Sequence, residues 1–493
     1  MSSYIMAIDQ GTTSTRTCLF NQAGSLVAQA SENYPQIYPQ PGWVEHNPED
    51  IWRTTTATIK KSMEQAGIVG SQVLSIGITN QRETVMLWDK NSHKPIYNAI
   101  VWQCRRTENI CKKLKKEKKD KMIQKKTGLV VDPYFSGSKI QWILQNVSGS
   151  KQLSQKGQLR AGTVDTFILW RLTGGQTHKT DVSNASRTML MNLQSLQWDP
   201  ELLKLFQIHE SLLPEINPSA GLFGKTKGLD FLPDGIPIAG IAGDQQAALF
   251  GQAGFNTGEV KCTFGTGSFI LLNTGPQIVR SKSKLLSTLA WQLKGQKPVY
   301  ALEGGAFVCG AAVQWLRDGL GLIEKSSDIE SLAASVKNSD GVEFVPALTG
   351  LGAPYWRANA RGVITGLTRG TTKAHLARAT LEALALQNAE ILEVMQKDLG
   401  KKIKSIKVDG GAAINNLLMQ IQADFSGVPV VRPKNIETTA LGAAYLAGLG
   451  IGVWSSQKEI AQIWQKDHEF KVQMSPKNRA LRISQWRKSV VKA

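Results

Sequence analysis

Two turns rich in glycine and hydroxyl side chains are the first candidates for chemistry in this sequence. Residues 11–14 (Gly-Thr-Thr-Ser) and residues 265–267 (Gly-Thr-Gly) each join two short apolar runs, one turn in each half of the chain. The backbone N–H groups of such a turn form a concave nest of donors that suits phosphate oxygens. Taken alone, each turn is more simply an ordinary hairpin connection. A Gly-Gly turn before a helix-like segment, at residues 408–415, is a third site of close backbone approach, and the three together favour phosphate binding.

Charged residues flank the first of these turns. Asp9 directly precedes the turn and Arg16 follows it. Magnesium in proteins is held by few carboxylates and keeps most of its waters, so Asp9 is predicted to hold Mg²⁺ through water. Arg16 supplies a fixed positive charge near the expected phosphates.

A carboxylate and a charge pair are candidates for binding a hydroxyl-bearing acceptor. Asp244 ends the apolar run 236–242, where ligands commonly meet α/β sheets, and its carboxylate could take a proton from a reacting hydroxyl. The competing interpretation is a helix N-cap ahead of Gln245. Arg82 and Glu83 together carry no net charge, which suits a neutral polyol because one side chain donates and the other accepts. Taken alone, the two residues are more simply an exposed surface ion pair.

Other catalytic patterns are missing from the sequence. It has no complete Walker A motif, no strand-linked G-x-G-x-x-G, no protein-kinase HRD or DFG set, no G-x-S-x-G elbow and no HExxH. The six histidines are scattered, and the five cysteines form no CxxC pair. We therefore expect no histidine-based metal centre, no zinc site and no disulfide framework.

Strands that alternate with helices must position these residues, and they predict an α/β architecture with buried central sheets. The strand–turn–strand pattern at the N-terminus recurs after Gly258, which indicates two related halves with a boundary near residues 251–258. The expected strands are residues 4–8, 15–20, 73–79, 84–88, 236–242, 259–263, 268–273 and 403–408, and the expected helices are residues 48–67, 245–250 and 412–425, the last ending at Gly427.

Composition bounds the class of protein. The chain has 493 residues, of which 42% are hydrophobic and 20% charged, so it is long enough for two large domains and too apolar for extended disorder. No apolar run approaches the roughly 18 residues that span a bilayer, and the N-terminal residues lack the pattern of a signal peptide. With the odd number of unpaired cysteines, this predicts a cytoplasmic protein without a transmembrane segment.

Most of the formal charge of +19 lies in two segments. Residues 112–126 hold nine lysines against two acidic residues, and residues 471–493 hold seven basic residues and no acid. The near-helical spacing of Ile110, Leu114 and Met122 predicts that the first segment is an amphipathic surface helix. A patch for nucleic acid or anionic lipid is one interpretation. A solvated surface is favoured, and no nucleic-acid partner is expected, because no nucleic-acid-binding motif accompanies the charge.

Longer motifs resemble the FGGY family of carbohydrate kinases, over nearly the whole chain from about residue 4 to residue 455. Residues 134–146 (YFSGSKIQWILQN) are similar to the first signature of that family, and residues 362–382 are similar to the second. The segments that most resemble those members of the family whose acceptor is glycerol are residues 80–84, 95–106, 240–251 and 348–356.

The resemblance implies a fold, a reaction and a set of site residues. The implied fold is two actin/hexokinase-like (ribonuclease H-like) α/β domains flanking a nucleotide cleft, at residues 1–252 and 253–455, followed by a basic helical extension at residues 456–493. The implied reaction transfers the γ-phosphoryl group of ATP, with Mg²⁺, to glycerol, giving sn-glycerol 3-phosphate and ADP in glycerol uptake and degradation. A homo-oligomer, dimer or tetramer, is also implied. The implied site residues are Asp244 as catalytic base; Arg82, Glu83, Trp102, Tyr134, Asp244, Gln245 and Phe269 for glycerol; Thr12, Thr13, Ser14, Arg16, Thr266, Gly310, Gln314, Gly411 and Asn415 for the nucleotide; and Asp9 for the metal.

Several of these residues also have an ordinary interpretation. Trp102 and Phe269 could be core aromatics, Gly310 could serve helix packing, Gln314 could be a surface amide and Asn415 a helix-start residue.

Two segments depart from the family. Residues 225–235 lack the arginine of the glycine-rich loop through which some bacterial members bind a sugar bisphosphate, so inhibition by that route is not expected. The basic tail also differs from the usual ending of the family.

The rival functions are another FGGY sugar kinase, such as a pentulose kinase, and a non-catalytic binder that uses the basic surfaces. Residues 80–84 and 240–251 argue against the sugar kinase.

Overall fold

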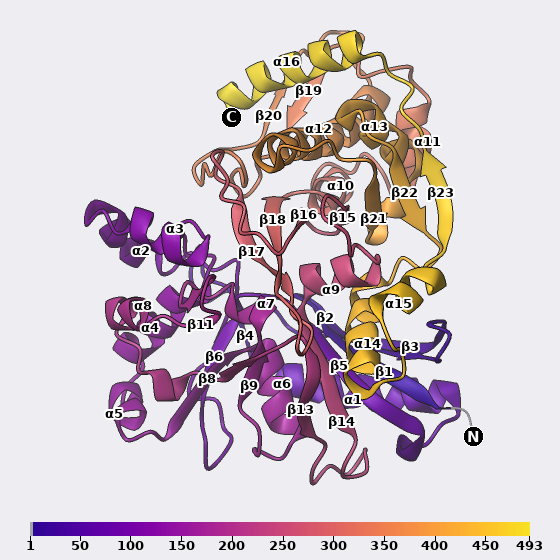
Figure 1. Cartoon of the computed structure of the whole chain (residues 1–493). Coiled ribbons are helices and arrows are strands. Elements are labelled where there is room, and N and C mark those ends of the chain that lie inside the picture. The colour runs from indigo at the N-terminus through magenta and orange to yellow at the C-terminus, as the bar shows by residue number, and fades with distance from the viewer. Residues whose placement is uncertain (1–2) are drawn as a thin grey trace. The chain divides into compact units, whose positions relative to one another are not determined.

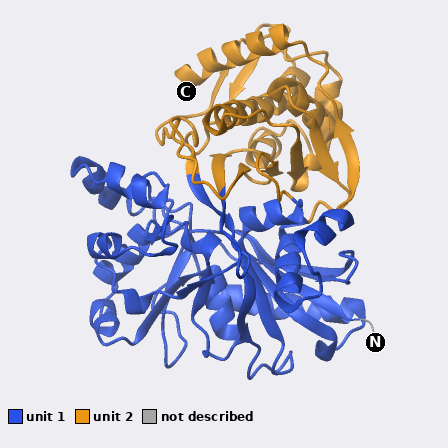
Figure 2. Cartoon of the chain, viewed as in Figure 1, with its two compact units in different colours: residues 1–253, 287–300, 438–463 blue, residues 254–286, 301–437, 464–493 orange. Residues whose placement is uncertain are grey.

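The computed structural model describes residues 3–493, and these residues form two compact units (Figure 2). Unit 1 comprises the chain up to Ala253 with residues 287–300 and 438–463, and unit 2 comprises residues 254–286, 301–437 and 464–493. The first change of unit falls one residue from the expected boundary at 252/253. The units differ from the expected contiguous segments in that each is assembled from three parts of the chain.

The central sheet of unit 1 is built around β1. This strand pairs antiparallel with β2 and parallel with β5, and β14 continues the sheet parallel to β5. Ile5, Met6, Ala7 and Ile8 of β1 are all fully buried, as expected for a sheet covered on both faces. In order across the sheet, the strands are β13 (Ala220–Lys225), β14 (Pro237–Gly243), β5 (Val73–Asn80), β1 (Tyr4–Gln10), β2 (Ser14–Phe20) and β3 (Leu26–Asn33).

The sheet of unit 2 repeats this arrangement (Figure 1). At its centre β15 pairs antiparallel with β16 and parallel with β21, as β1 does with β2 and β5. The order β23-β22-β21-β15-β16-β18 corresponds strand for strand to the order of unit 1, which confirms the predicted pair of related halves. The strands are β23 (Lys466–Phe470), β22 (Val430–Pro433), β21 (Ile406–Asp409), β15 (Val260–Phe264), β16 (Ser268–Gly275) and β18 (Val299–Ala306).

Helices with strong capping signals cover the sheets. In unit 1, α1 (Pro48–Ala66) begins at the cap Asn47, whose side chain accepts from the Glu49 amide, and ends at Gly67 with φ 63°. In unit 2, α13 (Asn416–Ser426) follows the cap Asn415 and ends at Gly427 as predicted, whereas the expected start at residue 412 lies in a separate 3-10 helix, Gly411–Ile414. The other helices used below are α4 (Ser136–Asn146), α9 (Asp244–Gly251), α10 (Gly310–Gln314), α12 (Lys373–Leu399), α14 (Thr438–Ile451) and α16 (Pro476–Lys492).

Close packing explains why α14 belongs to unit 1. A Cβ added at Gly442 of α14 would lie 1.8 Å from the Ala247 carbonyl oxygen of α9, and one added at Gly77 of β5 would lie 2.2 Å from the Ala443 carbonyl oxygen. Only glycine permits backbones to approach this closely. Since these contacts join segments far apart in the sequence, the contiguous boundary at residue 455 has no counterpart in the structure.

The basic C-terminal tail is part of the fold of unit 2. Strand β23 completes the sheet, and α16 packs through Trp486, which is buried and whose Nε1 donates to Glu390 at 2.6 Å. Arg482 pairs with Glu343 and, at 2.9 Å, with Glu382. The expected extension 456–493 is therefore divided, since residues up to 463 belong to unit 1 and the rest to unit 2.

The lysine-rich segment forms two helices rather than one. Helix α2 (Glu108–Lys116) and helix α3 (Asp120–Thr127) are separated at Lys118, whose φ of 56° no α-helix accommodates. Leu114 and Ile123 are buried on these helices, while the lysines between them are exposed. The prediction of a single amphipathic helix is wrong, because the residues after Lys116 leave the helical conformation.

Two further expectations concern cysteines and membranes. All five cysteines lie in the described part of the chain and are free and buried. Among residues 3–493, no helix is both long enough and apolar enough to cross a membrane.

Candidate active site

The turn between β1 and β2 is held from its carbonyl side. The turn is closed by the Gly11 amide, which donates to the Ser14 carbonyl at 2.9 Å. The Tyr34 hydroxyl lies 2.5 Å from the Gly11 carbonyl oxygen and 2.8 Å from that of Thr12, and the Tyr34 amide donates to the Thr13 carbonyl at 3.2 Å. In a planar trans peptide, the carbonyl of one residue and the N–H of the next point in opposite directions. With its carbonyls bound from one side, the turn directs the N–H groups of residues 12–14 to the other, which is the arrangement of an anion-binding nest.

Buried amides form the layer beneath this turn. Gln81 Nε2 donates to the Gly11 carbonyl at 3.1 Å, and Gln36 Nε2 donates to the Thr12 carbonyl at 3.1 Å. His46 lies 2.8 Å from Gln36 Oε1 through Nε2 and 3.3 Å from Gln81 Nε2 through Nδ1. Burial lowers the pKa of His46 to about 4, so the ring is neutral at pH 7 and bonds one amide as donor and the other as acceptor. Sequence reasoning missed Tyr34, Gln36, His46 and Gln81, because their relation to the turn depends on chain crossings and not on spacing.

Asp9 and Arg16 lie opposite each other in the β1–β2 register, directly below the turn. Both side chains are half-buried. Among the described residues, no group of three or more His, Cys, Asp or Glu side chains is arranged to hold a metal ion. One carboxylate beside a candidate phosphate-binding turn would fit a magnesium ion that arrives on the phosphates of a nucleotide and keeps its waters.

Parallel strands bring the candidate acceptor residues together. Asn80 at the end of β5 is in register with Gly243 at the end of β14, so Arg82 and Asp244 follow at the same edge of the sheet. Arg82 Nε lies 3.0 Å from Asp244 Oδ1, with the arginine side chain 2% exposed and the aspartate 30% exposed. Gly243, and not Asp244, is the N-cap residue of α9, so the capping interpretation of Asp244 is wrong.

Glu83 forms an ion pair with a residue far away along the chain. Glu83 Oε1 accepts from Arg187 Nε at 2.6 Å, in an ion pair whose two side chains are both at most 1% exposed. Glu83 has φ 62°, a left-handed backbone conformation. The guanidinium of Arg187 also lies over the rings of Tyr134 and Phe135, at 5.8 and 5.4 Å. The sequence offers no signal for Arg187, which is far from Glu83 along the chain.

Two aromatic residues connect the first turn to this acceptor region. Trp102 Nε1 donates to Thr12 Oγ1 at 3.0 Å, and the Trp102 ring meets the Tyr134 ring edge to face with centroids 5.7 Å apart. Trp102 is half-buried and Tyr134 is buried. Within unit 1, hydrogen bonds and ring contacts thus link Thr12, Trp102 and Tyr134. Gln245 is the second residue of α9, and its backbone amide donates to Asp244 Oδ1 at 2.7 Å.

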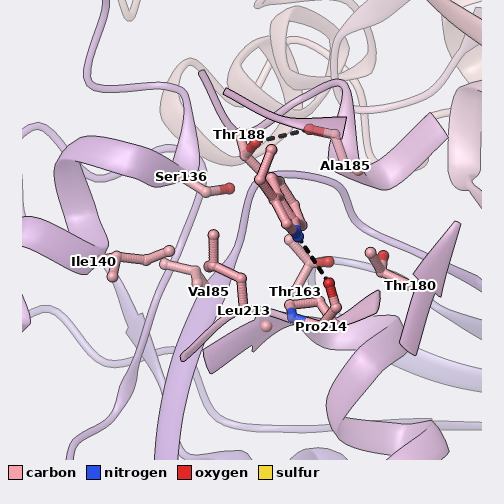
Figure 3. A pocket seen from close by; sticks show the side chains of 11 residues that line it. Val85, Ser136, Ile140, Thr163, Thr180, Ala185, Thr188, Leu213 and Pro214 are labelled. Carbon is pink, nitrogen blue, oxygen red and sulfur yellow. Dashed lines mark hydrogen bonds between the residues drawn. The ribbon is translucent and has the colours of Figure 1, made fainter. Parts of the chain in front are cut away.

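A small cavity lies behind this region and is not a substrate site. It measures about 10 Å³ and is lined by Val85, Ser136, Thr163 and Trp198, among others (Figure 3). A volume of this size holds about one water molecule. Neither a polyol nor a nucleotide fits there.

The turn of unit 2 is also closed by a backbone hydrogen bond from its first glycine, one residue tighter than in unit 1. The Gly265 amide donates to the Gly267 carbonyl at 2.9 Å, and α10 approaches so closely that the Gly310 amide donates to the Gly265 carbonyl at 2.9 Å. A Cβ added at Gly310 would lie 2.8 Å from that carbonyl oxygen, so the packing interpretation of Gly310 holds whatever else it binds. Thr266 accepts at its carbonyl from the Cys309 amide at 2.8 Å. Gln314 is exposed at the end of α10.

The two glycines after β21 differ in what they require. Gly410 has φ 86°, and a Cβ there would lie 2.6 Å from the Phe264 carbonyl oxygen, so glycine is needed for the fold. Gly411 has no positive φ, and a Cβ added there meets no atom within 4 Å.

Asn415 caps α13 by accepting from the Leu418 amide at 2.8 Å, as its ordinary interpretation predicted. Phe269, near the start of β16, packs against Gly305, where a Cβ would lie 2.7 Å from the ring.

Known proteins match the chain along almost its whole length. Residues 4–251 match the N-terminal domain of the FGGY family of carbohydrate kinases, and residues 260–451 match its C-terminal domain. A glycerol kinase of Bdellovibrio bacteriovorus is 66% identical over 486 residues, covering 99% of this chain and 98% of the relative, and glycerol kinase 2 of Thermotoga maritima is 53% identical over 487 residues, covering 99% and 98%.

Solved structures have the same α/β two-domain fold. The glycerol kinase of Plasmodium falciparum with ADP aligns with a TM-score of 0.92 and 38% identity, covering 100% of this chain and 98% of that one. A ligand-bound xylulose kinase of Lactobacillus acidophilus aligns with a TM-score of 0.85 and 26% identity, covering 99% and 96%.

Proposed function

The chain belongs to the FGGY family of carbohydrate kinases, and we propose that it transfers the γ-phosphoryl group of ATP to glycerol, giving sn-glycerol 3-phosphate and ADP. The observation that carries the proposal is the set of charges at the sheet edge. Arg82 is paired with Asp244 and Glu83 with Arg187, so the region offers donors and acceptors without a net charge. Such a region suits a neutral polyol better than a carboxylate or a phosphate. The full-length similarity to curated glycerol kinases supports the same acceptor.

Asp244 is the proposed catalytic base. As a primary hydroxyl of glycerol attacks the γ-phosphorus, Asp244 takes its proton, an O–P bond forms, the bond from the γ-phosphorus to its bridging oxygen breaks, and ADP leaves. The Arg82 guanidinium and the backbone amide of Gln245 both form hydrogen bonds to the Asp244 carboxylate, so they orient it. Its 30% exposure leaves the carboxylate accessible to an acceptor.

The proposed acceptor site has a polar and an apolar part. Arg82, Glu83, Tyr134, Asp244 and Gln245 bind the hydroxyl groups of glycerol, and Trp102 and Phe269 cover its carbon face.

The proposed nucleotide residues are the backbone turns and their neighbours. The N–H groups of residues 12–14 bind phosphate oxygens that gain charge during transfer. When bound on ATP, Mg²⁺ neutralises phosphate charge, and Asp9 holds it through water. The open space at Gly411 supports a role in nucleotide binding, since neither its backbone conformation nor its packing requires glycine. The full proposed set is Thr12, Thr13, Ser14, Arg16, Thr266, Gly310, Gln314, Gly411 and Asn415.

A direct assay tests the proposal. Purified protein is incubated with ATP, Mg²⁺ and glycerol, and glycerol 3-phosphate and ADP are measured; xylulose and erythritol serve as alternative acceptors. We expect phosphorylation of glycerol with a higher kcat/KM than for either alternative. A preference for xylulose would replace glycerol with a pentulose as the substrate.

Three broader expectations belong to the same proposal. The reaction takes place in the cytoplasm, which the free cysteines support. The chain forms a homo-oligomer, as the family resemblance implies. Nucleic acid is not a partner: in the tail, Arg482 and Arg487 pair with acidic side chains of unit 2.

A further inference from the structure

Lys139 is a buried ammonium group to which the proposed reaction gives no role. It lies in the first turn of α4 and is 0% exposed. Its Nζ donates to the Tyr134 carbonyl at 2.7 Å and to the Glu83 carbonyl at 3.2 Å. The Ser136 hydroxyl donates to the same Glu83 carbonyl at 3.0 Å. One side chain therefore joins two backbone segments, each of which carries a proposed glycerol-binding residue.

Burying this ammonium is costly, so its presence needs a reason. Removal from water disfavours the charged form and lowers the pKa of Lys139 to about 8. The charged and titratable groups that act on it are Glu83, Cys104 and Asp132, which favour the ammonium, and Arg105, which disfavours it. A methionine would fill much of the same volume without the cost of desolvation. What a methionine lacks is the N–H groups that reach both carbonyls.

The Glu83 backbone adopts a conformation that needs support from its surroundings. Its φ of 62° is unfavourable for a residue with a Cβ, and such conformations persist where the surroundings hold them. Arg187 holds the Glu83 carboxylate, while Lys139 and Ser136 hold its carbonyl. Tyr134 is fixed through the same ammonium.

We propose that Lys139 is a positioning residue that fixes the backbones of Glu83 and Tyr134 relative to each other, so that the hydroxyl groups of one acceptor molecule meet both side chains at once. This inference rests on the proposed function, since it assigns Lys139 to the acceptor part of that site. Because Lys139 is 0% exposed and its Nζ donates to two backbone carbonyls, we expect it to contact neither the acceptor nor the nucleotide. Its loss therefore weakens acceptor binding and leaves nucleotide binding unchanged.

The first test is Lys139→Met, which keeps the volume and removes the donors. We expect the KM for glycerol to rise at least tenfold, the KM for ATP to stay within twofold, and kcat to fall less than the glycerol KM rises. Ser136→Ala, which removes only one of the two donors to Glu83, is expected to raise the glycerol KM by a smaller factor. An unchanged glycerol KM in folded Lys139→Met overturns the proposal.

Ile143→Ala is the matched control. Ile143 is fully buried on the same helix and touches neither carbonyl through a hydrogen bond, so its truncation destabilises α4 without releasing the two segments. We expect its glycerol KM to stay near that of the wild type. If Ile143→Ala raises the glycerol KM as much as Lys139→Met does, Lys139 has only a structural role and the proposal is wrong. Should Lys139→Met not fold, Lys139→Arg, which retains charge and N–H donors, is expected to fold and to bind glycerol better than Lys139→Gln.

Hydrogen exchange separates this inference from the proposed function. In Lys139→Met without substrate, amides of residues 82–85 and 134–137 are expected to exchange faster together, whereas Ile143→Ala speeds exchange within α4. If the wild type does not phosphorylate glycerol, the proposed function fails, and the exchange experiment still decides whether Lys139 couples the two segments. Unchanged exchange in both segments overturns the coupling.

Discussion

Arg82 Nε lies 3.0 Å from Asp244 Oδ1, and the two residues follow strands that are parallel neighbours in the sheet of unit 1. The guanidinium is almost fully buried, so it is a fixed charge that holds the carboxylate in one orientation. Arg82 Nη1 also donates to Gln246 at 3.3 Å, which anchors the arginine to α9. The carboxylate keeps enough exposure to meet an acceptor while its direction is set by the protein. This is the arrangement that a general base requires.

Asp244→Asn keeps the size of the side chain and removes the base. General-base catalysis contributes about 10²–10⁴-fold, so we expect kcat for glycerol phosphorylation to fall by roughly three orders of magnitude. The KM or Kd for ATP should change less than threefold, because the substitution leaves the proposed phosphate-binding turns untouched. Steady-state kinetics and ATP-binding titration check both values. Turnover within tenfold of the wild type would remove Asp244 from the role of base.

The buried pair Glu83–Arg187 predicts a non-additive effect on stability. Arg187→Met removes the buried guanidinium that pairs with the Glu83 carboxylate, and breaking such a pair costs about 3–5 kcal/mol. Glu83→Gln combined with Arg187→Met removes both charges, so we expect the double variant to be more stable than Arg187→Met alone. Chemical denaturation of the wild type, both single variants and the double variant measures the coupling. Additive losses would show that the two charges contribute independently.

Gly411 and Gly310 predict opposite consequences of the same substitution. Gly411→Ala finds open space, so we expect unfolding transitions like those of the wild type together with a KM for ATP raised about tenfold, since the added methyl group occupies room proposed for the nucleotide. Gly310→Ala places a Cβ 2.8 Å from the Gly265 carbonyl oxygen, so it should lower stability by about 1–3 kcal/mol as well as disturb the turn.

Thermal unfolding and ATP kinetics on both variants separate the two cases. The glycerol KM serves as an internal control and should stay within twofold in Gly411→Ala. If Gly411→Ala leaves the ATP KM unchanged, Gly411 does not approach the nucleotide.

The local elements of the fold could be predicted because their signals lie within a few residues of one another. The β1–β2 hairpin was expected at residues 4–8 and 15–20 and is found at Tyr4–Gln10 and Ser14–Phe20, since an apolar run, a glycine turn and another apolar run suffice to specify it. The repeat of this hairpin after Gly258 likewise revealed two related sheets.

What could not be predicted depends on contacts between distant segments. The chain returns to unit 1 at α14, which packs closely against Gly77 and Ala247. No local sequence pattern predicts this close packing. Glu83 is paired with Arg187, which is 104 residues away along the chain, and its backbone is left-handed; no local sequence pattern predicts either feature. The support of the first turn by Tyr34 and Gln36 was missed for the same reason.

His46 predicts how acid acts on the support of the first turn. Its pKa is lowered to about 4 in the folded protein, against about 6.5 in an unfolded chain, because its ring is buried. Between these two pH values the unfolded chain binds a proton that the folded protein does not, so the contribution of His46 makes stability fall as the pH drops from 6.5 towards 4. At pH 5 this contribution lowers the free energy of unfolding by about 2 kcal/mol relative to pH 7.

The test compares the wild type with His46→Asn by chemical denaturation at pH 7 and pH 5. His178, whose pKa is also lowered to about 4, and Asp165, whose pKa is raised to about 6, are present in both proteins, so their opposing pH effects cancel in the difference. At pH 7 the variant should be less stable, because it loses the paired bonds to Gln36 and Gln81. At pH 5 the difference in unfolding free energy between the wild type and the variant should be smaller by about 2 kcal/mol, because only the wild type must keep the His46 imidazole neutral there. A deficit that is equal at both pH values would mean that His46 is protonated without unfolding and that the amide layer beneath Gly11 and Thr12 tolerates its charge.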